Sequence, residues 1–330
     1  MGFSKEIGID LGTANILIYV KGEGIVVNEP SVVAMDAETH KALAVGAEAK
    51  EMLGKTPGRV QAIRPLKDGV IADFQVTEIL ITHFINKLNL KGVFSRPTIL
   101  ICCPSNITSI EKSAIKDVAE RCGAKRVFIE EEPKVAAIGA GLDISRPAGH
   151  MVIDIGGGTT DVAVLSLGDI VTSTSLKIAG DRMDEEIIHY LKDKYKLLIG
   201  DRTAEQIKIE IGTAVRGGRE DKVMEVRGRD LVTGLPHTVE ISADETELAL
   251  RENCNTIVAA AKSVLEKTPP ELAADIVSRG IFLTGGGALL HGLDALLEKE
   301  LNVPVFVADN ALDCVAEGCG VMLNNLHYVK

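Results

Sequence analysis

Residues 152–167 read VIDIGGGTTDVAVLSL: an apolar run, an aspartate, a glycine-rich turn with a threonine, and a second apolar run. Residues 7–20, IGIDLGTANILIYV, repeat this arrangement near the start of the chain. Asp10 and Asp154 hold the same place in the two copies. In each copy the pattern predicts a buried strand, a hairpin turn at the glycines and a second strand.

The glycine turns suit an anion that is rich in oxygen. Because glycine has no Cβ, backbone N–H groups can approach such an anion closely, and Thr13 and Thr159 add hydroxyl donors. Asp10 and Asp154 can hold Mg²⁺ through water, since this ion loses its hydration shell reluctantly. Two such hairpins facing each other would bind a polyphosphate from both sides, in a cleft between two similar domains. A purely structural hairpin is the alternative for either copy taken alone.

Two common nucleotide-binding motifs do not match these turns. Neither turn fits G-x-x-x-x-G-K-[ST], and G-x-G-x-x-G fails because a strand rather than a helix follows the glycines. A third glycine cluster, LTGGGALL at residues 283–290, stands at the head of a predicted helix. The three clusters together favour phosphate binding over a structural role.

Composition narrows the class of protein. A chain of 330 residues with 46% hydrophobic residues predicts two globular domains with sizeable cores. The formal net charge of −11 argues against broad electrostatic attraction to nucleic acid. No apolar run is long enough to span a membrane, and the first residues are not a secretory signal. The six cysteines form no C-x-x-C pair, so we interpret them as reduced core thiols of a cytoplasmic protein.

Strand-like and helix-like segments alternate along most of the chain, which predicts α/β layers. Thr108 and Glu111 have the spacing of a capping box at the start of one helix. Pro133 suits the first turn of another helix. Residues 217–240 are polar and glycine-rich, and we expect them to form a strand-poor peripheral subdomain.

The sequence resembles the bacterial actins of the MreB family, within the superfamily of actins, Hsp70 chaperones and sugar kinases. The similar motifs follow one another in order over nearly the whole chain: IGIDLGTAN, NEPSVVA, IRPLKDGVIADF, EEPKVAAIGAGL, VIDIGGGTTDVAV, IAGDRMDEEI, GDRTAEQIKIEIG, GRDLVTGLP, EKTPPELAADI and FLTGGGALL. The resemblance implies an α/β fold of two RNase H-like, actin-like ATPase domains with a nucleotide cleft between them.

The resemblance also implies where the domains lie. Domain I would span residues 1–145 with an inserted small subdomain at about 33–65. Domain II would span residues 146–330 with an inserted small subdomain at about 182–245. We expect the C-terminal helix, residues 310–330, to pack back on domain I.

ATP or ADP and Mg²⁺ are the ligands that the resemblance implies. The two phosphate loops would be Gly12, Thr13, Ala14 and Asn15, and Gly156, Gly157, Gly158 and Thr159. The adenosine and α-phosphate side would meet Gly285, Gly286, Gly287 and Ala288, and the nucleoside would be bordered by Glu205, Gln206, Ile207 and Lys208. For Glu205 and Lys208 the alternative is a solvated helix face. Asp10 and Asp154 would hold the magnesium ion through water.

Glu132 is the residue that we expect to act in catalysis. It ends an apolar strand and stands before Pro133 at a helix start, where the helix dipole favours an ionised carboxylate. The resemblance implies that this acid orients the attacking water, with help from Thr159. A helix-capping acid is the alternative, and the family motif alone distinguishes Glu132 from Glu130 and Glu131.

The function implied by the resemblance is that of a weak ATPase that polymerises into paired protofilaments and organises cell-wall synthesis in rod-shaped cells. Its partners would be further copies of itself, the anionic inner surface of the cell membrane and membrane proteins of the wall-elongation machinery, with no nucleic acid. The protein would be cytoplasmic and peripheral on the inner face of the membrane. The resemblance leaves open which paralogue of the family this is.

Other members of the superfamily supply the alternatives. A sugar or small-molecule kinase would need an acceptor pocket and a base for a sugar hydroxyl, and the sequence has no separate motif for either. An Hsp70-type chaperone would need a substrate-binding domain after the ATPase half, whereas this sequence stops at Lys330.

Val93 and Phe94 are the residues that we expect to reach the membrane. They stand in a predicted helix-to-strand loop, where two adjacent apolar residues are unexpected. Lys87, Lys91 and Arg96 flank them and suit an anionic leaflet. In MreB-type proteins a hydrophobic loop at this place inserts into the bilayer. Folding of the two side chains back onto their own subdomain is the alternative.

Overall fold

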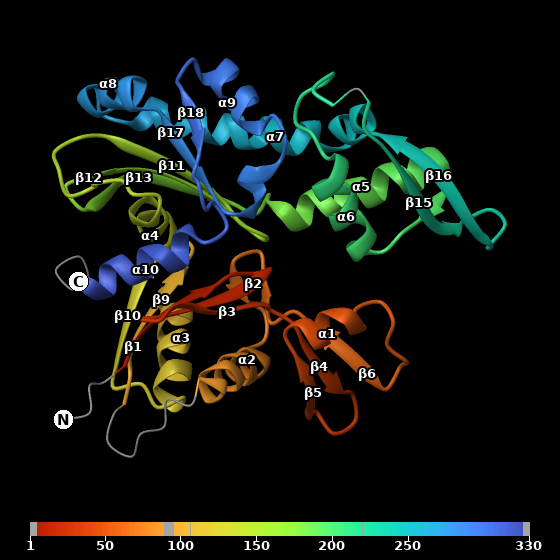
Figure 1. Ribbon diagram of the computed structural model, residues 1–330, viewed down its shortest axis with the longest axis horizontal. Coiled ribbons are helices and arrows are strands. Elements are labelled where there is room, and N and C mark those ends of the chain that lie inside the picture. Colours follow the sequence, from red (N-terminus) through yellow and green to blue (C-terminus); the bar gives the residue numbers. More distant parts are fainter. Residues whose placement is uncertain (1–4, 89–95, 106, 220, 326–330) are drawn as a thin grey trace. The chain divides into compact units, whose positions relative to one another are not determined.

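The computed structural model describes residues 5–88, 96–105, 107–219 and 221–325 (Figure 1). These residues divide into two compact units. Unit 1 is drawn from Met1–Pro147, Leu167–Ile170 and Leu312–Lys330, and unit 2 from Ala148–Ser166 and Val171–Ala311. In sequence, unit 2 is therefore inserted into unit 1.

Unit 1 is built on a five-stranded sheet with the strand order β10-β9-β1-β2-β3. Its strands are β1 (Glu6–Leu11), β2 (Asn15–Val20), β3 (Gly24–Pro30), β9 (Thr98–Cys103) and β10 (Arg126–Glu131). β1 pairs antiparallel with β2 and parallel with β9, and β9 is parallel to β10. The first glycine turn joins β1 to β2, so the hairpin predicted there is confirmed.

Helices cover both faces of this sheet (Figure 1). They are α2 (Phe74–Lys87), α3 (Ser109–Arg121), α4 (Glu132–Gly139) and α10 (Cys314–Asn324). Apolar side chains of α2 and α3 share one core with Ile7 and Ile9 of β1. On the other face α10 packs on α4 and β1, so closely that a Cβ on Gly8 would lie 2.3 Å from the Cβ of Cys319. Because side chains alternate along a strand, Asp10 shares this second face with Gly8.

Unit 2 repeats this plan around a sheet with the strand order β13-β12-β11-β17-β18. Its strands are β11 (His150–Ile155), β12 (Thr160–Ser166), β13 (Asp169–Leu176), β17 (Ile281–Thr284) and β18 (Val305–Val307). β11 pairs antiparallel with β12 and parallel with β17, which is parallel to β18. The second glycine hairpin is thus confirmed, and with it the α/β architecture of two similar sheets.

The helices of unit 2 pack around this sheet. They are α5 (Gly180–Tyr195), α6 (Asp201–Ile211), α7 (Ala243–Lys267), α8 (Pro270–Arg279) and α9 (Leu293–Leu301), with a 3₁₀ turn η1 (Gly286–Leu289). α7 packs on β12 and α8 on β11. The core joins Met151 and Ile153 of β11 to Leu250 and Ile257 of α7.

Each unit also carries smaller sheets. In unit 1 they are a three-stranded sheet of β5 (Ala42–Val45), β4 (Val33–Asp36) and β6 (Val60–Ile63), with α1 (Ala47–Met52), and a ribbon of β7 (Leu66–Lys67) and β8 (Val70–Ile71). In unit 2 the small sheet has the order β14 (Leu197–Leu198), β15 (Val223–Asp230) and β16 (Pro236–Ser242).

The small sheet of unit 2 contradicts one prediction. Residues 217–240 were expected to be poor in strands, but they contain β15 and most of β16, which pair antiparallel. Val226 is the one buried residue of β15, and exposed Glu225 and Arg227 stand on either side of it. A strand with one face in water is largely polar, so its composition resembles that of a loop.

Several local predictions are confirmed. Thr108 and Glu111 form the predicted capping box at the start of α3, and Pro133 stands in the first turn of α4. All six cysteines are free, and five of them are buried as predicted. Cys122 is an exception: it is half-buried at the end of α3, with its Sγ 3.1 Å from the Thr82 hydroxyl.

A polar cluster ties α7 to α5 in unit 2. The Glu245 carboxylate accepts hydrogen bonds from Lys194 Nζ at 2.5 Å, from Tyr195 Oη at 2.7 Å and from the backbone N–H of Ser242 at 3.0 Å. Burial raises the pKa of Glu245, but these bonds outweigh burial and bring the pKa down to about 2. The cluster should therefore stabilise unit 2 while Glu245 is ionised.

We expect Glu245→Gln to lower the free energy of unfolding by about 1 kcal/mol at pH 7, because an ion pair and charge-assisted bonds are lost. A carboxyl whose pKa is depressed by folding stabilises the folded state above its unfolded pKa, and this contribution disappears as pH falls through the folded pKa. The difference in the free energy of unfolding between variant and wild type should thus shrink as the pH falls from 4.5, the ordinary pKa of a glutamate, to about 2. Urea unfolding across this range measures it. Glu266→Gln, at an exposed acid of the same helix, is the control, and a pH-independent difference would contradict the assignment.

Candidate functional site

The first glycine turn of unit 1 is held from several sides. The Ser31 hydroxyl donates to the Gly12 carbonyl at 2.7 Å, and the Ser31 N–H donates to the Ala14 carbonyl at 2.9 Å. The Thr13 hydroxyl is buried and accepts from the N–H of Gly69 at 3.3 Å, so its own proton is still available to a ligand. A Cβ on Gly12 would lie 2.7 Å from the Asn15 carbonyl oxygen, which explains the glycine at that position.

Acidic residues lie at the same end of the unit 1 sheet as this turn. The strand register places Asp10 of β1 beside Cys102 of β9, and Cys102 beside Glu130 of β10. Glu132 begins α4 immediately after β10 and is 8% exposed. The sheet therefore brings two predicted site residues to the same end of the sheet: Asp10 on β1, and Glu132 directly after β10, with β9 between these two strands.

In unit 2 the glycine turn is anchored to the start of α5. The N–H groups of Gly180 and Asp181 donate to the carbonyls of Gly156 and Gly157 at 3.1 and 2.8 Å. The turn is closed by the Gly156 N–H, which donates to the Thr159 carbonyl at 2.9 Å. The backbone N–H groups of Gly157 and Gly158 make no hydrogen bond within the described part of the chain. Consecutive backbone donors of this kind can bind an anion.

Asp154 is the last residue but one of β11, just before this turn. Its carboxylate is 6% exposed and accepts a hydrogen bond from the Thr284 hydroxyl at 2.7 Å. Burial raises the pKa of Asp154 to about 6, the Thr284 bond opposes this rise, and the nearby charge of Asp161 adds to it. The group is thus mostly ionised at neutral pH, but its charge is poorly compensated, and a cation beside it would be stabilised.

The third glycine cluster lies against the end of β11. Gly285 has a φ of +78°, and a Cβ there would lie 2.3 Å from the carbonyl oxygen of Ile155. Residues 286–289 form the 3₁₀ turn η1, and the longer helix α9 begins only at Leu293. Unit 2 therefore brings the Gly156–Thr159 turn, Asp154 and the Gly285 cluster together.

The four predicted residues of α6 have different surroundings. Lys208 Nζ lies 2.8 Å from Asp184 Oδ1 and donates to the Gly180 carbonyl at 2.8 Å, so it joins α6 to the start of α5. Gln206 bonds Glu210 at 2.8 Å on the surface, whereas Ile207 is fully buried in the core. Glu205 is half-buried. A ligand could reach Ile207 only through its backbone.

Sequence reasoning missed three polar residues of unit 2: Asp161, Asp184 and Thr284. Burial raises the pKa of Asp184 to about 6, and the Lys208 ammonium opposes the rise. Thr284 directly precedes the Gly285 cluster at the end of a buried strand, which was a usable signal. Asp184 has no local signal, because its role depends on a lysine of another helix.

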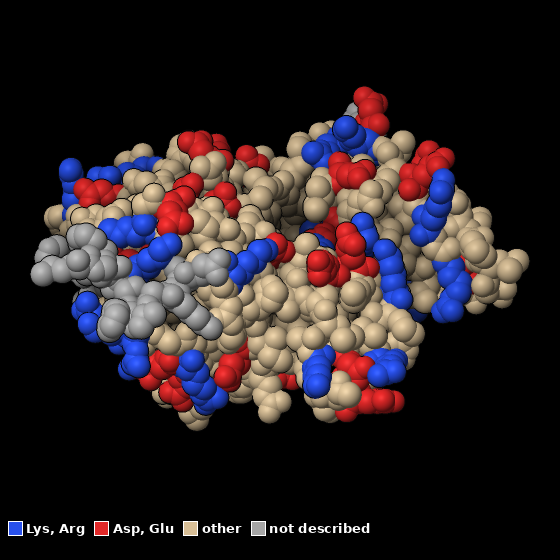
Figure 2. Space-filling view, turned by 60° about the horizontal axis from the view of Figure 1, so that its bottom comes forward, with Lys and Arg blue, Asp and Glu red and all other residues tan. Residues whose placement is uncertain are grey.

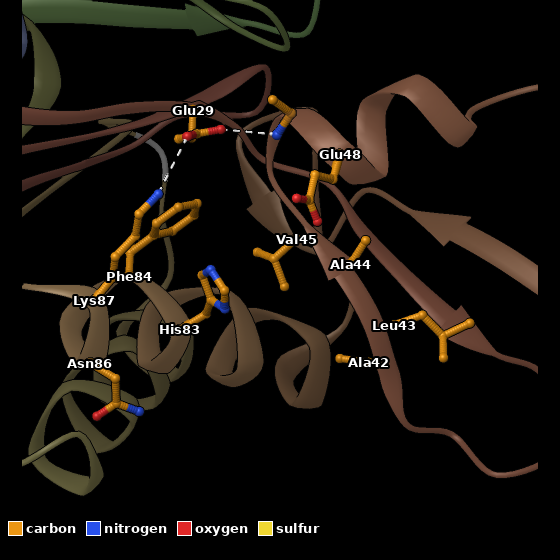
Figure 3. Close-up of a pocket in the computed structure, with 11 residues that line it drawn as sticks. Glu29, Ala42, Leu43, Ala44, Val45, Glu48, His83, Phe84, Asn86 and Lys87 are labelled. Atoms are coloured by element: carbon orange, nitrogen blue, oxygen red, sulfur yellow. Dashed lines mark hydrogen bonds and ion pairs between the residues drawn. The ribbon is translucent and has the colours of Figure 1, made fainter.

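A separate cavity of about 710 Å³ lies in unit 1, where α2 meets β5 and α1 (Figure 3). His83, Phe84 and Lys87 line it from α2, opposite Leu43 and Val45 of β5. Its lining contains none of the predicted site residues. Val93 and Phe94, which are predicted to reach the membrane, lie outside the described residues.

Comparisons with known proteins place this geometry in context. A model of the family described as MreB/Mbl protein matches residues 4–330. The chain is 64% identical over 324 residues to the cell shape-determining protein Mbl of Bacillus cereus, covering 98% of this chain and 97% of that protein. It is 53% identical over 327 residues to the cell shape-determining protein MreB of Escherichia coli, covering 97% of this chain and 94% of that protein.

A solved structure shows the same fold. MreB5 of Spiroplasma citri, bound to ADP, has a TM-score of 0.94 at 42% identity, over 98% of this chain and 97% of that chain. The same protein bound to AMPPNP also has a TM-score of 0.94. The predicted actin-like α/β fold is therefore confirmed.

We expect Thr284→Val to raise the pKa of Asp154 above its present value of about 6, because the hydroxyl that stabilises the carboxylate is lost. Carboxyl ¹³C shifts followed by NMR across pH 4–8 measure the change. Thr160→Val is the matched control, since the equally buried Thr160 hydroxyl donates to the Ile178 carbonyl instead. An unchanged Asp154 titration in Thr284→Val would show that this hydrogen bond does not control the charge.

Proposed function

The chain belongs to the MreB/Mbl family, and on that basis we propose that it binds ATP, hydrolyses it slowly and polymerises into filaments that determine cell shape. The observation that carries the proposal is the turn at residues 156–159, where two backbone N–H groups without partners in the described chain follow the buried carboxylate of Asp154. A phosphate group would accept hydrogen bonds from the two N–H groups, and its metal ion would compensate the charge of the carboxylate. MreB5, which binds ADP and AMPPNP, supports nucleotide as the ligand.

Each unit has its own candidate groups for binding a nucleotide. Gly157, Gly158 and Thr159 of unit 2 would bind phosphate oxygens, and the Thr13 hydroxyl of unit 1 would donate to them as well. The Gly285 cluster would take the adenosine and α-phosphate side, since glycine there leaves the backbone open to a ligand. Glu205 and Lys208 would border the nucleoside.

Asp10 and Asp154 would hold Mg²⁺ through water. Within the described residues, no group of three or more His, Cys, Asp or Glu side chains could hold a metal ion. Mg²⁺ usually keeps several of its waters and takes its other ligands from one or two carboxylates and from phosphate. When bound, Mg²⁺ would neutralise charge on the phosphates, and the buried carboxylate of Asp154 would keep the ion beside the turn.

Hydrolysis would depend on Glu132. Phosphoryl transfer requires little covalent work from the protein, so a carboxylate that orients water and accepts its proton can suffice. Glu132 is 8% exposed at the N-terminus of α4, where the helix dipole favours its ionised form. The hydroxyl of Thr159 would help Glu132 to orient the attacking water.

The proposed partners are further copies of the chain in paired protofilaments, the anionic inner face of the cell membrane, and membrane proteins of the wall-elongation machinery. None of the helices in the described part of the chain combines the length and apolarity needed to span a bilayer. On the face shown in Figure 2, acidic and basic side chains of the described residues are interspersed. Together with the net charge of −11, this pattern does not favour nucleic acid as a partner.

To test the proposed chemistry, Glu132→Gln should slow ATP hydrolysis at least about tenfold, roughly the low end of what a positioned base supplies. ATP affinity, measured by calorimetry with Mg²⁺, should stay nearly unchanged, and filaments should still be visible by electron microscopy because the ATP state is kept. Glu131→Gln is the matched control, since Glu131 lies one residue away but is paired at 4.0 Å with Lys112 on the surface.

Two results would contradict this function. Equal turnover in Glu132→Gln and wild type would remove Glu132 from the chemistry. Turnover that requires an added sugar, with no filaments in the presence of ATP, would instead support the sugar-kinase alternative.

For the membrane, we expect Val93→Ser combined with Phe94→Ser to abolish co-sedimentation with anionic phospholipid vesicles while ATP turnover persists. Burying one Val and one Phe gains roughly 3–5 kcal/mol at most, so single molecules bind weakly and filaments bind firmly by multivalency. The control is Leu43→Ser with Phe74→Ser, an exposed apolar pair of unit 1. Undiminished binding by the first variant would place the anchor elsewhere, with Met1–Phe3 as the next candidate.

A further inference from the structure

A buried ion pair stands beside the proposed catalytic acid. Lys134 Nζ lies 3.0 Å from Glu130 Oε2, and the two side chains are only 6% and 9% exposed. Removing two charges from water costs several kcal/mol per ion, and their mutual attraction often fails to recover that cost. Such a pair is therefore weak evidence for stability and calls for another explanation.

The position of Lys134 adds to this cost. It is the third residue of α4, which begins at Glu132. The positive end of the helix dipole disfavours a cation in the first turn. Burial and the helix dipole thus both disfavour the charged form of Lys134 at this position. Positions where a residue conflicts with local preferences are often functional sites.

The pair surrounds Glu132 in sequence and joins the two elements that position it. Glu130 belongs to β10 and Lys134 to α4, so the ion pair spans the strand-to-helix junction at which Glu132 stands. The register also puts Glu130 in one row with Cys102 and Asp10 across the sheet. Glu130 is therefore a third carboxylate on the face that holds Asp10 and Glu132.

The carboxylates of Asp10, Glu130 and Glu132 lie at one end of this sheet. Cys102 separates Asp10 from Glu130 in the row, and Glu132 follows Glu130 by two residues. An uncompensated charge on Glu130 would add a further negative charge beside those of Asp10 and Glu132. Lys134 compensates that charge at 3.0 Å.

We propose that Lys134 and Glu130 are positioning residues for ATP hydrolysis: their ion pair fixes the β10–α4 junction that aims Glu132 and keeps the Glu130 carboxylate away from the metal and the attacking water. This inference rests on the proposed ATPase function. It assigns the pair to the chemical step rather than to nucleotide binding or to folding.

The pair can be replaced as a unit to separate these roles. Glu130→Leu combined with Lys134→Met should keep or raise the melting temperature, because an apolar pair of similar size removes the desolvation cost. The affinity for Mg²⁺–AMPPNP should stay within about twofold, while kcat falls about tenfold or more, since a small misplacement of a catalytic group is costly. Lys134→Arg keeps the cation and should restore most of kcat.

Further variants serve as controls. Lys112→Met removes the cation of the half-buried pair with Glu131, 4.0 Å away, and should leave kcat unchanged. Glu132→Gln in the same assay reports whether the proposed function itself holds. If the wild type does not turn over ATP, or Glu132→Gln matches it, the proposed function fails and this inference fails with it.

Other outcomes overturn the inference alone. A wild-type kcat in the double variant, while Glu132→Gln is impaired, would show that the pair does not position Glu132. A parallel loss of AMPPNP affinity and melting temperature would show that the pair is merely structural. An equal fall of kcat in Lys134→Arg and the double variant would exclude its charge as the cause.

Discussion

The hydrogen-bond register of each glycine hairpin is the constraint on which the two units depend. In unit 2 the pairs Asp154 with Asp161 and Ile155 with Thr160 close the turn at one position. A slip of one residue would move Asp154 to the opposite face of the sheet, because side chains alternate along a strand. A second register, that of β11 with the parallel strand β17, sets Asp154 beside Thr284. These two ladders of backbone bonds together fix the Asp154 carboxylate, the N–H groups of the turn and the Thr284 hydrogen bond that lowers the pKa of the carboxylate.

The sequence predicted what depends on local pattern and missed what depends on tertiary pairing. Both hairpins, the Thr108 capping box and the helix start at Pro133 follow from neighbouring residues, and all are confirmed. The hairpin of β15 and β16 was missed because one solvent-facing side makes its strands polar. The partners of Lys208 and Asp154 lie 24 or more positions away, and no local period announces them.

The buried acids Glu130 and Asp154 are stabilised by different means. Unit 1 places a full cation, Lys134, against Glu130, whereas unit 2 gives Asp154 only the hydroxyl of Thr284. Asp154 therefore has a raised pKa of about 6 and a strong preference for an added cation. Under the proposed function, this difference suits a metal beside the unit 2 turn and a water-activating acid in unit 1.

The last described helix, α10, belongs to the first unit. It packs on α4 and β1, although the whole of unit 2 separates it from them in sequence. During synthesis on the ribosome, unit 2 can therefore be complete while one face of the β1 sheet, with Gly8, still lacks its cover. The nascent chain would carry that uncovered face until Cys314–Asn324 emerges from the exit tunnel. A chaperone that protects this face during translation would compete directly with the final helix.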